Sequence, residues 1–104
     1  MPPDPIETLT DTLIALPVDQ YPRLLETLTR KTINRTPQIC GGNARIRQTR
    51  IAVWTLISLQ QQGADDTELL DDFPGLTPFD LIAARTYYRN HPHEIDRLIA
   101  DSDP

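Results

Sequence analysis

The stretch 76–88 carries the strongest helix signal in the chain and sets the order of the elements around it. Apolar residues recur there at the spacing of one buried helix face: Phe79, Ile82, Ala83 and Tyr87. Thr77 can cap the helix N-terminus, Pro78 suits its first turn, and Asp80 stands where a capping-box acid belongs. Two helical segments precede it, so this helix takes the recognition position of a helix-turn-helix module.

The whole chain of 104 residues is predicted to be mainly α-helical and long enough for one small domain. Apolar spacing and turn residues predict a helical hairpin over 6–30, strands over 33–35 and 44–51, helices over 52–62 and 65–73, and a short C-terminal helix over 92–100. The small β-hairpin is marginal alone, so it should pack on the helices or pair with a second subunit. We therefore expect an N-terminal extension over 1–31, a helix-turn-helix domain over 32–100 and a frayed acidic tail over 101–104.

Charge is distributed unevenly along the chain, whose net charge is −5. Residues 31–50 carry five basic and no acidic side chains, whereas residues 64–104 carry three basic and ten acidic ones. The candidate contacts to nucleic acid are Arg45, Arg47 and Arg50 on or beside the second strand, with Arg85 and Arg89 on the recognition-position helix. The alternative is that these arginines form a solvated face or pair with acidic side chains of the same fold.

A second apolar stripe on the recognition-position helix consists of Leu81, Ala84 and Tyr88. We expect it to pack on the final helix or on a partner chain, because interfaces favour this composition. The N-terminal end of the same helix holds Asp80 close to the pair Asp71 and Asp72, which argues against insertion into the major groove.

No catalytic or metal site is predicted, and no cofactor is expected. Cys40 is the only cysteine, and His91 and His93 lie beside a helix start, where capping or exposure explains them. Gly41 and Gly42 suit a turn rather than a phosphate loop, because a strand and not a helix follows them. The apolar runs are too short for a membrane span and the first residues lack a secretory signal, so we expect a cytoplasmic protein.

Several motifs resemble those of the domain-of-unknown-function family numbered 433: residues 40–47 (Cys-Gly-Gly-Asn-Ala-Arg-Ile-Arg), 49–51, 53–54, 63–64, 68–77, 87–88 and 91–92. The resemblance covers roughly residues 32–98. It implies a helix-turn-helix fold similar to antitoxins of the VapB kind, which are often encoded beside a PIN-like ribonuclease toxin.

Together, the residues and the resemblance favour an antitoxin-like homodimer that sequesters a PIN-like ribonuclease and represses its own operon by binding operator DNA. The amphipathic ends 6–30 and 92–100 could lie in a partner's groove. In that case Glu94 to Asp101 would cover a basic RNA-binding surface, and Arg97 would approach the acidic catalytic cluster. The alternatives are a stand-alone DNA-binding regulator and an interaction domain that does not bind nucleic acid.

Overall fold

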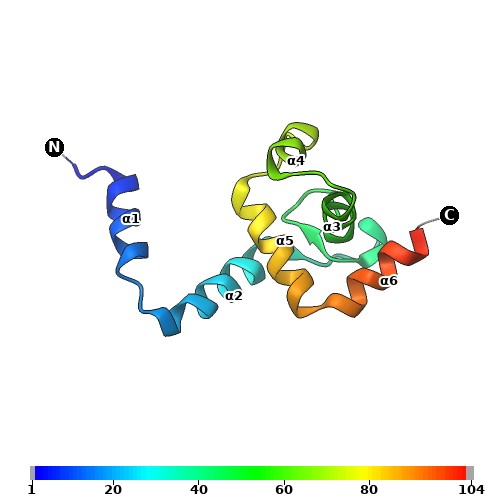
Figure 1. Ribbon diagram of the computed structural model, residues 1–104, viewed down its shortest axis with the longest axis horizontal. Coiled ribbons are helices and arrows are strands. Elements are labelled where there is room, and N and C mark those ends of the chain that lie inside the picture. Colours follow the sequence, from blue (N-terminus) through cyan, green and yellow to red (C-terminus); the bar gives the residue numbers. More distant parts are fainter. Residues whose placement is uncertain (1, 103–104) are drawn as a thin grey trace.

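The computed structural model describes residues 2–102 and is mainly helical, as predicted (Figure 1). Its helices are α1 (Pro5–Ile14), α2 (Tyr21–Thr32), α3 (Val53–Gln61), α4 (Asp66–Asp72), α5 (Pro78–Asn90) and α6 (Pro92–Ser102), with short 3-10 turns η1 (Val18–Gln20) and η2 (Cys40–Gly42). Strands β1 (Ile33–Asn34) and β2 (Arg45–Ile46) form the antiparallel ribbon. Residues 101–102 of the predicted frayed tail continue α6, and residues 103–104 lie outside the described residues. No helix within residues 2–102 has the length and hydrophobicity of a membrane span.

Helix α5 is the centre of the fold. Helix α2 packs along one side of it, and α3, α4 and α6 lie against the other (Figure 1). Coverage from two sides buries residues of both predicted stripes: Ala83 and Tyr87 of the first, and Leu81 and Ala84 of the second. Thr86, which belongs to neither stripe, is buried as well. The predicted core position of Phe79 is wrong, because this side chain is 60% exposed at the first turn, beyond the reach of both layers.

The helix-turn-helix part comprises α3, α4 and α5. Leu56 of α3, Leu69 of α4 and Leu81 of α5 are completely buried against one another and against Ile95 of α6. Gly63 ends α3 as predicted, with a φ of +105° that side chains rarely adopt. These contacts place the third helix of the module inside the body of the protein.

The predicted capping box at the start of α5 is present. The Asp80 N–H donates to Thr77 Oγ1 over 3.3 Å, and the Thr77 N–H donates to Asp80 Oδ2 over 2.8 Å. The same carboxylate receives Arg47 Nε at 3.0 Å and Arg47 Nη2 at 2.7 Å, and Nη2 also donates to the Gly75 carbonyl oxygen. A residue of the ribbon region is thereby fixed to the N-terminus of the central helix.

The second strand is much shorter than the predicted 44–51 segment. Backbone at Arg47 takes a φ of +41°, and the Thr49 N–H and hydroxyl both donate to the Ile46 carbonyl oxygen. The chain therefore turns back, and Ala52 forms a bridge with Arg45 on the edge of β2 that β1 leaves open. Because β2 is flanked on both edges, Arg45 and Ile46 are both buried instead of alternating.

Helix α1 stands away from the rest of the molecule (Figure 1). None of its residues is buried, so the two helices that we predicted as a hairpin over 6–30 do not bury their apolar faces against each other. The chain consequently extends over 56 Å in one direction and about half of that, 30 and 29 Å, in the other two. We call residues 5–24, which comprise α1, η1 and the first turn of α2, the N-terminal arm.

We expect Asp80→Asn to lower the free energy of unfolding at pH 7 by about 1–2 kcal/mol, because the amide keeps a capping acceptor but loses the ion pair with Arg47. Burial alone would raise the pKa of Asp80, but hydrogen bonds from Arg47 and the Thr77 N–H, with the Arg47 charge, outweigh it and lower the pKa. A lowered pKa in the folded state gives stability that is complete above the ordinary aspartate value, about 3.9, and is lost as the pH falls through the lowered value.

The difference between wild type and variant should therefore be constant near neutrality and shrink below about pH 4. Chemical denaturation at several pH values measures it. Asp72→Asn, at an exposed carboxylate that forms no ion pair within residues 2–102, is the control and should change little. A gap between wild type and Asp80→Asn that does not depend on pH down to about 2 would contradict this role of the ion pair.

Candidate functional site

The predicted basic ribbon does not form a single exposed surface. Arg45 is only 3% exposed. Its guanidinium donates to the Thr49 carbonyl oxygen over 3.0 Å and to Thr36 Oγ1 over 2.9 Å, so it holds the 47–50 turn against the segment after β1. Its Nε is buried without a hydrogen-bond partner among the described residues. Arg45 therefore supports the fold and is not available to a phosphate.

Two further arginines of the predicted nucleic-acid set are held by carboxylates of the same chain. Arg47 binds Asp80, as described above, and Arg85 forms two parallel bonds of 2.8 and 3.1 Å with Asp66. The hydrogen bond from Arg85 lowers the pKa of Asp66, against the effect of burial. Arg50 and Arg89 remain exposed, but they lie on different parts of the protein, beside the ribbon turn and at the end of α5.

The residues that we predicted to face a partner chain do not lie on one common surface. Leu81 and Ala84 are fully buried in the core of the same chain, so they are not part of a free surface. The Tyr88 hydroxyl donates to Asp96 of α6 over 2.7 Å, which favours the packing on the final helix that we considered. Arg97 is on the surface, 3.9 Å from Asp101.

Exposed apolar side chains gather on the N-terminal arm. Eight large hydrophobic residues are exposed in the described part of the chain, and all except Phe79 belong to the arm: Ile6, Leu9, Leu13, Ile14, Val18, Tyr21 and Leu24. Ile6, Leu9 and Leu13 lie at spacings of three and four, so they form one continuous row along α1. A contiguous apolar row of this kind marks a surface for interaction.

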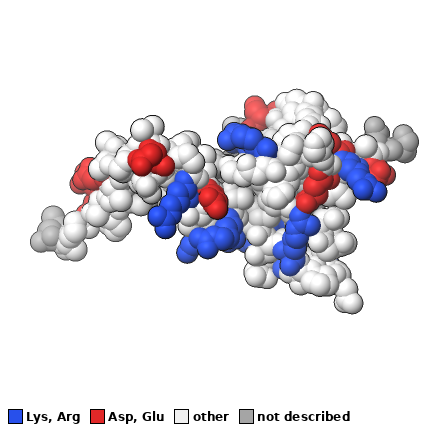
Figure 2. All heavy atoms as spheres, turned by 90° about the horizontal axis from the view of Figure 1, so that it is seen from below, with Lys and Arg blue, Asp and Glu red and all other residues white. Residues whose placement is uncertain are grey.

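Local sequence makes α1 an amphipathic helix with an acidic face. Asp4 caps its N-terminus, since the Ile6 N–H donates to Asp4 Oδ1 over 3.0 Å, and Pro5 occupies the first turn. Glu7 and Asp11 lie one turn apart on the face opposite the apolar row. The first 22 residues contain no basic side chain. Figure 2 accordingly shows red but no blue side chains toward the free end of the arm, and blue ones from its junction with the domain onward.

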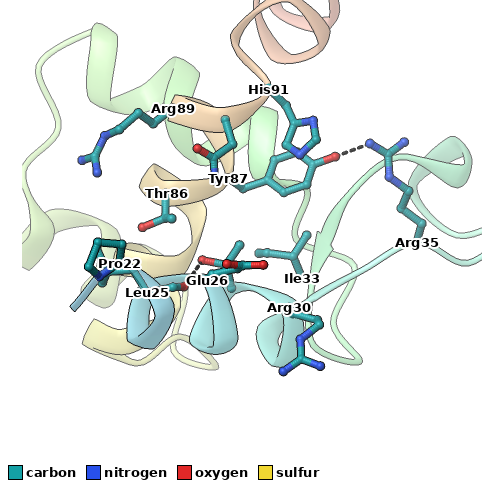
Figure 3. A pocket seen from close by; sticks show the side chains of 12 residues that line it. Pro22, Leu25, Glu26, Arg30, Ile33, Arg35, Thr86, Tyr87, Arg89 and His91 are labelled. Atoms are coloured by element: carbon teal, nitrogen blue, oxygen red, sulfur yellow. Dashed lines mark hydrogen bonds between the residues drawn. The ribbon is translucent and has the colours of Figure 1, made fainter. Parts of the chain in front are cut away.

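A groove opens between α2 and α5, where the arm joins the domain (Figure 3). Its volume is about 740 Å³. Leu25, Ile33 and Tyr87 give it an apolar floor, and its polar lining includes Glu26, Thr29, Thr86 and His91. Arg30, Arg35 and Arg89 stand at separate corners of the groove (Figure 3). The groove therefore combines an apolar floor with a mainly basic rim.

One end of this groove is fixed by a polar cluster. Arg35 donates to the Tyr87 hydroxyl and to Glu94 of α6, and the Tyr87 hydroxyl donates to Glu94 Oε2 over 2.7 Å. The ring of His91 stacks on that of Tyr87, with the centroids 4.3 Å apart. Burial, followed by the bond to Glu94, raises the pKa of the Tyr87 hydroxyl. This cluster ties β1, α5 and α6 together and keeps the groove floor in place.

These features define a class of protein: a small, mainly helical domain with a helix-turn-helix core, a short ribbon and a projecting amphipathic arm. The sequence profile of DUF433, a family described as proteins of unknown function, matches residues 33–88, and the chain belongs to this family. The chain is also similar to a crystal structure of a DUF433 member from Anabaena variabilis ATCC 29413, determined at 2.00 Å resolution. That likeness has 46% identity, covers 94% of this chain and 99% of the other, and has a TM-score of 0.67. No curated protein matches the chain significantly.

Sequence reasoning pointed to an amphipathic N-terminal segment, which we predicted as a hairpin, but it did not point to the groove. The repeat of apolar residues at helical spacing pointed to 6–30 as a segment that needs a partner surface. The groove is built from α2, β1 and α5, whose contacts join residues far apart in the chain, and only the basic character of Arg30 and Arg35 could have hinted at it. Within residues 2–102, no group of three or more potential metal ligands is assembled.

The role of Arg45 can be separated from contact with nucleic acid by comparing Arg45→Ala with Arg50→Ala. We expect Arg45→Ala to lower the free energy of unfolding by about 2 kcal/mol, because it removes charged hydrogen bonds to two segments. Arg50→Ala, at an exposed site, should stay within about 0.5 kcal/mol of wild type. Denaturant titrations give both values. Equal stability of the two variants would refute the structural role of Arg45.

Proposed function

We propose that this protein is a non-catalytic, antitoxin-like binding module that acts as an assembly held together by its N-terminal arm. The protein that it sequesters is, in this proposal, a PIN-like ribonuclease. The apolar row on the arm carries the proposal, because it is exposed on a segment that contacts little of its own chain.

A short helix such as α1 is unstable in water unless its apolar face packs against another surface. A helix of 10 residues is shorter than the roughly 12–15 that an isolated helix needs to be even marginally stable in water. No residue of the described range 2–102 buries α1, so in this proposal another polypeptide supplies the packing that keeps it folded. Each leucine or isoleucine transferred from water to an apolar contact contributes about 1.5–3 kcal/mol, so the row on α1 can support a specific interaction.

The ribonuclease enters through the family likeness, and the geometry suggests where it would bind. Glu94, at the start of the acidic segment expected to face the nuclease, is held by Arg35 and Tyr87. The exposed part of α6, with Arg97 and Asp101, is left for contact with the nuclease. In this proposal the arm assembles the protein, and the outer surface of the assembly binds the enzyme.

Binding to operator DNA has less support than binding to another protein. Arg45, Arg47 and Arg85 are all bound within the chain, and α5 is covered on two sides. A helix that reads the major groove must present a continuous exposed face to the bases. The proposal therefore rests on protein binding, with a homodimer as the expected assembly.

Co-expression with the product of the neighbouring gene, which this proposal expects to be a PIN-like ribonuclease, tests the proposal. We expect the two proteins to co-purify and the nuclease to be inhibited. The double variant Leu9→Glu, Leu13→Glu should reduce capture at least about tenfold, corresponding to about 1.4 kcal/mol, because it places two charges in the apolar row. Thr8→Glu adds a charge to the side of α1 away from the apolar row and should retain capture. Absence of co-purification with the wild-type chain would refute the antitoxin-like function.

A further inference from the structure

We propose that the N-terminal arms of two chains pack on each other about a two-fold axis, so that the apolar row of one α1 covers the same row of the second copy. Helix α6, at the end of the molecule opposite to the arm, stays open in this dimer (Figure 1). The inference rests on the proposed function in taking the arm as the element of assembly, and it identifies the second copy's arm as the surface that the arm contacts.

The amount of exposed surface fits a dimer. The protein exposes 7368 Å², whereas a folded chain of 11.8 kDa is expected to expose about 5,900 Å². Its Cα radius of gyration is 15.6 Å, against about 13 Å for a compact domain of this length. If each chain covers one side of its arm, it buries roughly half of the excess, about 750 Å². Each partner contributes a similar area, roughly 800 Å², to a stable interface of standard size.

The contact face of α1 suits a contact with its own copy. In a two-fold contact each patch meets an identical patch, so any charge on the patch would meet a like charge. The row of Ile6, Leu9 and Leu13 carries no charge, and Glu7 and Asp11 lie on the opposite face of the helix. Pairing through the row therefore leaves the carboxylates of both copies in water.

The threonines that flank the row can be covered by a partner without losing a hydrogen bond. Thr10 Oγ1 donates to the Ile6 carbonyl oxygen over 2.7 Å, and Thr12 Oγ1 donates to the Thr8 carbonyl oxygen over 3.0 Å. Because both hydroxyl groups bond to the backbone of their own helix, a second helix can lie over them without leaving a donor unpaired. The row and its flanks together form a surface that another α1 can cover closely.

The position and the charge of the arm favour another arm over an anionic partner. The side chains of the row are between 45 and 67% exposed, and α1 stands away from the domain, so a second arm can reach it (Figure 1). Helices that lie on membrane surfaces are rich in lysine and arginine on their polar face, and nucleic acid requires such residues to contact its phosphates. No basic residue precedes Arg23 in this chain.

Light scattering coupled to size-exclusion chromatography tests the dimer. We expect the wild-type protein to have twice its chain mass of 11.8 kDa. Leu9→Glu should raise the dissociation constant of the dimer at least about tenfold, because a carboxylate from each copy then enters the apolar contact. The matched control Thr8→Glu adds the same charge on the side of α1 away from the row and should dimerise like wild type.

Circular dichroism separates loss of the dimer from loss of the fold. No residue of α1 is buried within the described chain, so Leu9→Glu removes no contact from the core of the domain. The monomeric variant should lose the helical signal of α1, which is too short to be stable alone, and should keep that of the other helices. Its domain should still unfold cooperatively on heating, as that of the wild type does.

Cross-linking distinguishes an arm-to-arm contact from other dimers. The midpoint of α1 falls between Leu9 and Thr10, so Leu9 lies near its own counterpart whether the two helices run parallel or antiparallel. In chains that carry Cys40→Ser at the only native cysteine, we expect a short bis-maleimide to join two Leu9→Cys chains. Thr8→Cys should stay unlinked. In a mixture of Leu9→Cys and Arg89→Cys chains, links should join position 9 to position 9 and not to position 89 on the groove rim.

Three results would each overturn the inference. A monomeric wild-type chain would mean that the row serves a different partner, and a dimer that Leu9→Glu leaves intact would place the contact outside α1. A link from position 9 to position 89 in place of the link between two positions 9 would put the arm in the α2–α5 groove.

These outcomes are separate from those of the proposed function. An arm-to-arm dimer that does not capture the ribonuclease contradicts only the antitoxin-like function. A monomeric chain that captures the ribonuclease through its arm contradicts only the arm-to-arm contact.

Discussion

The buried carboxylate of Asp80 links parts of the fold that are far apart in sequence. It completes the cap of α5 and receives two bonds from Arg47, whose own backbone N–H donates to the Thr32 carbonyl oxygen at the end of α2 over 2.7 Å. Burial disfavours the charged form, yet the surrounding donors more than compensate, so the pKa of Asp80 is lowered. Through this one side chain the ribbon, the end of α2 and the start of α5 have fixed relative positions, and the walls of the groove depend on them.

The position of α2 explains why a helix-turn-helix core need not expose its third helix. In a DNA-reading module that helix keeps one face free for bases. Here α2 packs along the face that α3, α4 and α6 leave uncovered, and Thr86 and Tyr87 turn toward it. Helices α2 and α5 are not in contact along their whole length, and the groove lies where they separate. The same helix that covers the face a DNA-reading module would leave free thus also forms one wall of the groove.

Local signals in the sequence predicted much of the fold, because their physical causes lie within a few residues. The cap at Thr77, the glycine stop at Gly63 and the periods of the helices are of this kind. The burial of Arg45 was not predictable in this way, because it depends on a turn at Arg47 that brings Ala52 back along β2. The groove depends on packing between α2 and α5, and no periodic pattern records which face of a helix meets which neighbour.

The N-terminal arm shows which properties of a helix its local sequence determines and which depend on packing. Its sequence specifies a capped helix with an apolar row, but no other residue in the described range 2–102 buries that row. Local signals can therefore form the helix, whereas its packing depends on a surface that the described part of the chain does not supply. A contiguous exposed apolar row of this kind marks either a surface for interaction or a site of aggregation.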